Sequence, residues 1–93
     1  MSEKAGAHIL LTGRVQMVGF RWFVRRWAED LDLAGWVKNN PAGSVETRVE
    51  GKRDEIDLLL KELKVGPRGA TVEDMNVKWL PFENQFRTFE IRY

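Results

Sequence analysis

A single stretch links the first predicted strand to the first predicted helix: Thr12-Gly13-Arg14-Val15-Gln16-Met17-Val18-Gly19-Phe20-Arg21. A strand, a turn punctuated by glycine and the start of a helix bring several backbone N–H groups to the positive end of a helix dipole. Such a turn can bind an anion, most simply a phosphate. Arg21 adds a planar fork of donors that can hold phosphate oxygens in pairs. Because turns with glycine also occur where a chain only reverses direction, the stretch alone leaves both interpretations open.

The segments on either side have the patterns of a strand and a helix. Before the stretch, residues 8–13 include three apolar residues in succession, which favours a central strand. After it, apolar residues recur at helical spacing from Arg21 to about Leu33, and charged residues fill the other positions. Gly35 is well placed to end this helix or to lead into the next element.

The rest of the chain predicts a hairpin, a second helix and two further strands. In chain order these are strands over 35–40 and 44–50, a helix over about 53–64, and strands over 71–80 and 89–93. The strands over 35–40 and 44–50 are joined by a turn at residues 41–43. The second of them alternates, with Val45, Thr47 and Val49 on one face and polar residues on the other. This alternation predicts a β-hairpin with one wet face, to which Glu50 belongs.

The order of the elements, βαββαβ with a final C-terminal strand, predicts an α+β ferredoxin-like two-layer sandwich. Each helix has one apolar stripe, so both helices are expected on one face of a mainly antiparallel sheet. No repeat, linker or low-complexity segment interrupts the chain. We therefore expect a single domain over residues 7–93, preceded by a flexible N-terminal tail over residues 1–6.

Length, charge and composition narrow the function further. A chain of 93 residues is long enough for one small domain. Its formal net charge of +1 gives no basic excess of the kind that non-specific binding to nucleic acid or membranes requires. Cysteine is absent and His8 is the lone histidine, so we expect neither a disulfide framework nor a metal site. The chain shows neither a signal peptide nor a membrane span, and we expect a soluble, cytoplasmic protein.

Two segments together resemble the paired signatures of the acylphosphatase family. They are Gly13-Arg14-Val15-Gln16-Met17-Val18-Gly19-Phe20-Arg21 and Gly35-Trp36-Val37-Lys38-Asn39. Their order, separation and structural context are similar to those of the family, and the resemblance covers essentially the whole chain after the N-terminal tail. It implies a domain that hydrolyses the mixed anhydride of a carboxylic acid and phosphate, without a metal or a cofactor. The implied partners are a small-molecule acyl phosphate and inorganic phosphate, with no nucleic acid and no membrane, and we expect a monomer.

The resemblance also implies roles for individual residues. The phosphate-binding loop, which uses main-chain N–H groups, follows Gly13 and consists of Arg14, Val15, Gln16, Met17, Val18 and Gly19. The family's essential arginine corresponds to Arg21, which suits holding the phosphoryl group and offsetting charge on its oxygens. Its essential asparagine corresponds to Asn39, whose amide can orient an attacking water but is too weak a base to deprotonate it. Without the first signature, the favoured interpretation of Asn39 is a residue that caps local backbone groups at the end of a strand.

Met17 departs from the family, which usually has glycine at this position. If the loop requires a positive φ there, a residue other than glycine costs about 1–2 kcal/mol, and its side chain could crowd the site. The departure supports an alternative in which the domain binds phosphate or acyl phosphate but turns it over slowly. A ferredoxin-like RNA-binding domain is a third interpretation. Such domains stack bases on aromatic residues of the central strands, and residues 8–13 and 44–50 contain no Phe, Tyr or Trp.

Overall fold

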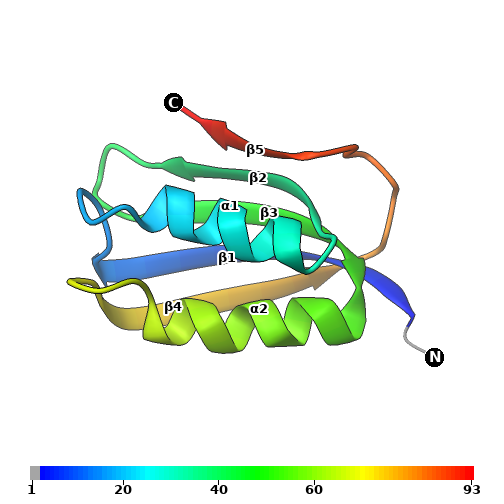
Figure 1. The fold of residues 1–93 in the computed structure, drawn as a ribbon, viewed down its shortest axis with the longest axis horizontal. Coiled ribbons are helices and arrows are strands. Elements are labelled where there is room, and N and C mark those ends of the chain that lie inside the picture. The colour runs from blue at the N-terminus through cyan, green and yellow to red at the C-terminus, as the bar shows by residue number, and fades with distance from the viewer. Residues whose placement is uncertain (1–2) are drawn as a thin grey trace.

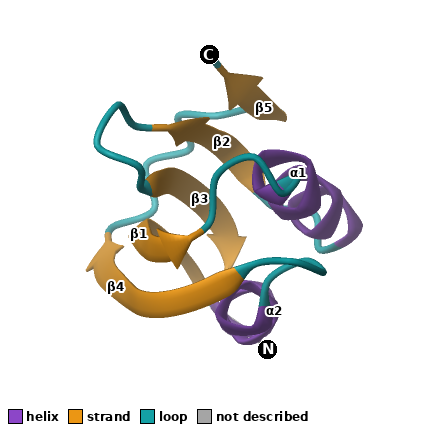
Figure 2. Ribbon diagram, turned by 90° about the vertical axis from the view of Figure 1, so that its left-hand side faces the viewer, coloured by secondary structure: helices purple, strands orange, loops and turns teal. Residues whose placement is uncertain are grey.

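The computed structural model describes residues 3–93 as two helices packed on a five-stranded sheet. The elements are β1 (Lys4–Arg14), α1 (Phe20–Asp30), β2 (Ala34–Asn39), β3 (Val45–Lys52), α2 (Arg53–Val65), β4 (Thr71–Leu80) and β5 (Phe89–Arg92). The strand order is β4-β1-β3-β2-β5, and all neighbours are antiparallel except β2 and β5. Both helices lie on the same face of the sheet (Figure 1), and the end-on view in Figure 2 separates the two layers. The predicted ferredoxin-like sandwich is confirmed.

The core lies between the helices and the three central strands. Helix α2 contributes Ile56, Leu59 and Leu63, which are all fully buried, at the spacing that the sequence predicted. Helix α1 contributes Val24 and Ala28 from its buried face. The sheet supplies its inward-facing residues Ala7, Ile9, Leu11, Val37, Val45, Thr47 and Val49. Each large apolar side chain buried here contributes about 1.5–3 kcal/mol, so this layer holds the fold together.

The β2–β3 hairpin alternates as predicted until Glu50. Val45, Thr47 and Val49 are fully buried on the face covered by the helices. Glu50, expected on the wet face, is only 2% exposed. Its two carboxylate oxygens accept hydrogen bonds, at 2.7 and 2.8 Å, from two main-chain N–H groups in the connection between β4 and β5. The prediction for Glu50 is therefore wrong, because a distant segment covers this end of the strand.

Two element boundaries differ from the predicted ones. Strand β1 begins at Lys4, since residues 4–6 pair with the last residues of β3. The predicted tail over 1–6 is therefore strand from Lys4 onward, and residues 1–2 lie outside the described residues. Helix α1 ends at Asp30 rather than near Leu33, because Asp32 adopts a φ of 57°, in the left-handed region that ends a helix.

The end of β1, the start of α1 and the end of β2 lie at the same end of the molecule (Figure 1). The loop after β1, the start of α1 and the end of β2 lie together at the left of Figure 1, with the C-terminus above them. This is the end at which both family signatures meet.

Neither described helix has the length and apolar character that crossing a membrane requires.

Candidate active site

The loop between β1 and α1 is fixed to the core at both ends. Val15 is fully buried directly after β1, and Phe20 is 2% exposed at the start of α1. Upstream, the register between β1 and β4 shifts between Thr12 and Gly13, where φ is 117°. A Cβ at Gly13 would lie 2.3 Å from the carbonyl oxygen of Thr71, so only glycine fits. The buried side chains of Val15 and Phe20 and the close approach at Gly13 therefore fix both ends of the loop.

The main-chain N–H groups from Gln16 to Trp22 have no hydrogen-bond partner in the described part of the chain. Gly19 has a φ of 75°, and its carbonyl oxygen accepts the first hydrogen bond of α1 from the N–H of Phe23 at 3.0 Å. No side chain caps this helix end. Within residues 3–93, none of the main-chain N–H groups from Gln16 to Trp22 donates a hydrogen bond. Grouped at the positive end of the helix dipole, these donors form a surface suited to an anion.

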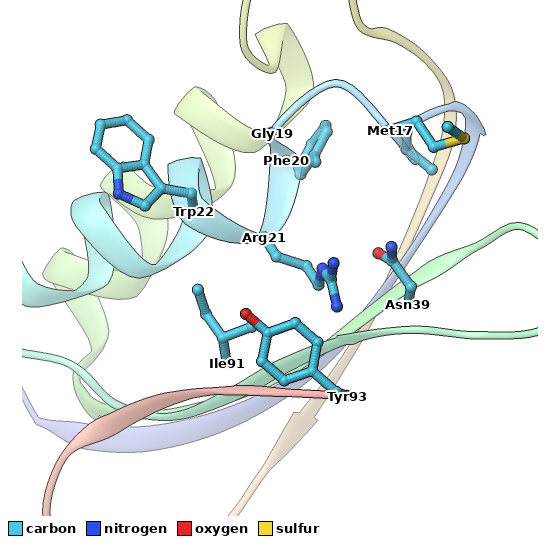
Figure 3. A pocket seen from close by; sticks show the side chains of 9 residues that line it. Met17, Gly19, Phe20, Arg21, Trp22, Asn39, Ile91 and Tyr93 are labelled. Carbon is cyan, nitrogen blue, oxygen red and sulfur yellow. The ribbon is translucent and has the colours of Figure 1, made fainter.

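Arg21 extends from the first turn of α1 across this surface. Its guanidinium carbon lies 4.6 Å from the centroid of the Tyr93 ring, and the side chain is half-buried. Figure 3 shows the guanidinium group between this ring and the amide of Asn39. In the described part of the chain, Arg21 forms no ion pair. Its donors and its charge are therefore free to meet an anionic ligand.

Asn39 is the last residue of β2 and faces Arg21 across the cavity (Figure 3). Its Oδ1 atom is buried and has no hydrogen-bond partner among residues 3–93. A buried acceptor without a partner costs about 1–3 kcal/mol, so its presence here requires an explanation. An oxygen in this position can accept a hydrogen bond from a water held in the cavity.

These groups surround one cavity of about 210 Å³. It is lined by Val15, Met17, Gly19, Phe20, Arg21, Trp22, Asn39, Ile91 and Tyr93. Two signatures that are far apart in the sequence therefore contribute to one site. Four of the lining residues were not predicted as site residues: Phe20, Trp22, Ile91 and Tyr93. The alternation of the last strand placed Ile91 and Tyr93 on the same face, but it did not indicate that β5 pairs with β2.

Met17 lines the rim of the cavity. Its backbone has a positive φ, the conformation that would favour glycine at this position. Its φ is 61°, in the left-handed region, and its side chain is 99% exposed. The loop thus adopts the positive φ that suits glycine. The Met17 side chain extends into solvent and does not fill the cavity.

Three residues of the predicted loop do not line the cavity: Arg14, Gln16 and Val18. Arg14 is exposed at the end of β1, and Val18 packs partly buried against the core. Gln16 turns its side-chain amide toward the turn between β2 and β3, where it donates two hydrogen bonds. Their side chains therefore do not face a ligand in the cavity, although their main chain forms part of the loop.

The lone histidine lies away from the cavity. His8 Nε2 donates a hydrogen bond to Glu46 Oε2 at 2.7 Å, and this bond lowers the pKa of the Glu46 carboxyl below its ordinary value of 4.5, against a smaller opposing effect of burial. Among residues 3–93, no group of three or more His, Cys, Asp or Glu side chains is placed to hold a metal ion.

Comparisons with known proteins identify the family to which the chain belongs. A family model described as acylphosphatase matches residues 7–91. The acylphosphatase of Salinibacter ruber is 45% identical over 82 residues, which cover 88% of this chain and 86% of that protein. That of Chlorobaculum tepidum is 38% identical over 91 residues, 98% of each chain. The crystal structure of acylphosphatase from Bacillus subtilis, 36% identical, is similar with a TM-score of 0.93 over 96% of this chain and 99% of that chain. The chain therefore belongs to the acylphosphatase family of enzymes.

Proposed function

We propose that this enzyme hydrolyses the carboxyl–phosphate bond of small acyl phosphates, with the loop and Arg21 holding the phosphoryl group and Asn39 orienting the attacking water. The observation that carries the proposal is the shared cavity, in which unpaired donors and a buried unpaired acceptor face the same space. Its volume of about 210 Å³ suits a small substrate. Pockets for drug-sized ligands are larger, at about 300–1,000 Å³.

The donors of the site match a phosphoryl group. Main-chain N–H groups at the start of α1 would receive its oxygens, and the planar guanidinium of Arg21 would bind two of them side by side. The Tyr93 ring beneath the guanidinium restricts the orientation of Arg21 without neutralising its charge. Donors fixed before the reaction stabilise negative charge that moves onto these oxygens during transfer. Phe20, Trp22 and Ile91 give the rest of the lining an apolar character, which suits the acyl group.

The acceptor of the site matches the attacking water. A water that donates one hydrogen to Asn39 Oδ1 turns an oxygen lone pair toward phosphorus, in line with the bond to the carboxylate. As the new P–O bond forms, the P–O bond to the acyl group breaks and the carboxylate leaves with the electron pair. The proton of the water passes to a phosphoryl oxygen. Because a carboxylate is already a good leaving group, positioning and electrostatics are sufficient for this step.

We also propose that the enzyme turns over without a metal, as a cytoplasmic monomer. The charge that a metal would offset is met in this mechanism by Arg21 and the main-chain donors. Turnover that is unchanged by excess chelator would support the absence of a metal. Light scattering on the purified protein would test whether it is a monomer, and cell fractionation would test its location.

Met17 is the observation that favours the alternative of a binding module with slow turnover. Its φ of 61° is a conformation that costs a methionine about 1–2 kcal/mol. Its side chain is nevertheless 99% exposed and leaves the cavity open. We therefore expect this cost to lower the stability of the protein more than its rate.

The decisive experiment measures release of carboxylate and phosphate from acetyl phosphate, with excess chelator and correction for spontaneous hydrolysis. Arg21→Ala should lower the rate by about 10²–10³-fold, the usual cost of removing a fixed electrostatic donor. Arg25→Ala is the matched control, because it removes the same charge one turn further along α1, where Arg25 pairs with Glu29. Its rate should equal that of the wild type. Equal rates for the wild type and Arg21→Ala would refute the mechanism.

A further inference from the structure

Gln16 belongs to the anion-binding loop, but its side chain does not face the cavity. Its Nε2 atom donates hydrogen bonds to the carbonyl oxygens of Asn40, at 2.7 Å, and Ser44, at 3.0 Å. Both hydrogens of the amide are therefore used, and both bonds go to the turn between β2 and β3. These partners lie 24 and 28 residues further along the chain.

The two carbonyl groups are the ones that close this turn. The N–H of Asn40 donates to the oxygen of Ser44 at 2.9 Å, and the N–H of Gly43 donates to the oxygen of Asn40 at 3.0 Å. Each carbonyl oxygen thus accepts one bond from the main chain and one from Gln16, which uses both of its lone pairs. Gln16 is therefore attached to the hydrogen-bonded frame of the turn rather than to a mobile tip.

This attachment joins the two halves of the active site. The main-chain donors and Arg21 come from the β1–α1 side, whereas Asn39 comes from β2 and directly precedes Asn40. Within residues 3–93, the bonds of Gln16 are the hydrogen bonds that connect the loop to the turn. Pairing through β3 fixes the ends of β1 and β2 relative to each other. Beyond those ends, the bonds of Gln16 hold the loop against the turn that follows Asn39.

We propose that Gln16 is a positioning residue, which holds Asn39 at the separation from the loop that lets a water on Asn39 reach the bound phosphoryl group. The inference rests on the proposed function. A displacement of about 1 Å between reacting groups can cost about 10²-fold in rate. Phosphate binding by the main-chain donors and Arg21 is local to the other half of the site. Loss of the Gln16 bonds should therefore lower kcat much more than it weakens phosphate binding.

Gln16→Met provides the first test, because methionine has a similar length and no donor. We expect kcat on acetyl phosphate to fall by about 10–10²-fold, with KM and the Kd of inorganic phosphate changed less than about threefold. Gln85→Met is the matched control, since the Gln85 amide donates to Glu83 at an exposed position outside the cavity. Its kcat and KM should equal those of the wild type. An unchanged kcat in Gln16→Met, or a loss confined to phosphate affinity, would overturn the proposal.

A double-mutant cycle with Asn39→Ala shows whether Gln16 acts through Asn39. If it does, adding Gln16→Met to Asn39→Ala should lower kcat by less than about twofold more, since the group that it positions is already gone. If the loss of kcat in the double variant equals the product of the two single losses, the role of Gln16 is overturned and that of Asn39 stays intact. If Asn39→Ala alone kept the wild-type kcat, the proposed function of Asn39 would itself be wrong.

Gln16→Asn keeps the test valid if Gln16→Met does not fold. It retains the amide but is shorter by one methylene, so it cannot reach both carbonyl oxygens. The same loss of kcat is expected at a melting temperature close to that of the wild type. A wild-type kcat in a folded Gln16→Asn would contradict the proposal.

Discussion

Replacing Met17 by glycine should stabilise the protein. Met17 has a φ of 61° and a side chain that is 99% exposed, so its removal loses almost no buried surface. The left-handed conformation costs a residue with a Cβ about 1–2 kcal/mol, and glycine is free of this cost. Glycine loses more backbone entropy on folding, which offsets about 0.4–1 kcal/mol. The free energy of unfolding should therefore rise by about 0.5–1 kcal/mol, which raises Tm by about 2–8 °C in a domain of this size.

Urea denaturation of the wild type and Met17→Gly, with equal m-values, measures this difference directly. Asn84→Gly is the matched control, because Asn84 also has a positive φ, at 53°. Asparagine adopts the left-handed region more readily than methionine does, so the gain should be smaller there. A free energy of unfolding that stays equal or falls in Met17→Gly would refute the reasoning. The strain at position 17 would then be absent in solution.

The same variant separates the enzyme from the slow-turnover alternative. Because the backbone at Met17 already has the conformation that glycine favours, kcat should change by less than about threefold. A rise in kcat of about tenfold or more, equivalent to about 1.4 kcal/mol in the barrier, would favour the alternative. Stability and rate measured on one pair of proteins thus answer two separate questions about the loop.

Three further predictions concern charge geometry, the core and pH. Arg21→Lys should lower kcat/KM by about 10²-fold, because a point charge cannot replace the planar fork; a wild-type value would show that charge alone suffices. Leu59→Ala, at a fully buried position, should lower the free energy of unfolding by about 2–5 kcal/mol. Leu58→Ala, at a position 47% exposed, should lower it by less than about 1 kcal/mol. Equal losses would contradict the burial of Leu59 in the core. The lowered pKa of Glu46, held down by His8, contributes stability that is present above pH 4.5 and lost as pH falls through the lower folded-state pKa. The free energy of unfolding of the wild type should therefore exceed that of Glu46→Gln by up to about 1 kcal/mol at neutral pH. The two values should converge once pH has fallen below the folded-state pKa of Glu46, and a difference that persists in acid would contradict this assignment.

Local patterns determined most of the fold, because each element buries one face of its own. The spacing of Ile56, Leu59 and Leu63 predicted α2, and alternation predicted the hairpin and the limits of β4. Alternation shows which residues share a face, but it does not show which strand is the neighbour. The parallel pairing of β5 with β2 and the burial of Glu50 beneath the β4–β5 connection both depend on segments far apart in the sequence. Neither could be predicted from a local period.

In the candidate site, too, short local motifs could be predicted from the sequence, whereas contacts between distant segments could not. Arg21 and Asn39 were predicted from two short signatures, each of which is contiguous in the sequence. The contacts around them were not, because Tyr93 reaches Arg21 from the end of the last strand and the Gln16 side chain, already predicted as part of the loop, reaches across to the turn after Asn39. A glutamine in a loop has no periodicity that reveals its hydrogen-bond partners. Residues proposed to act on a ligand were thus easier to predict than the long-range contacts around them.

The polarity of the cavity lining suggests how substrate and water take different places in it. The protein as a whole carries a net charge of only +1, so an anion is attracted by local donors rather than by a general field. Those donors, the main-chain N–H groups and Arg21, lie on the loop side. Asn39 Oδ1, a buried acceptor, lies on the strand side and would repel phosphate oxygens while attracting the hydrogen of a water. In-line attack can begin when the phosphoryl group lies on the loop side and the water lies on the Asn39 side. Because the leaving group departs opposite the attacking water, the acyl group then leaves away from Asn39.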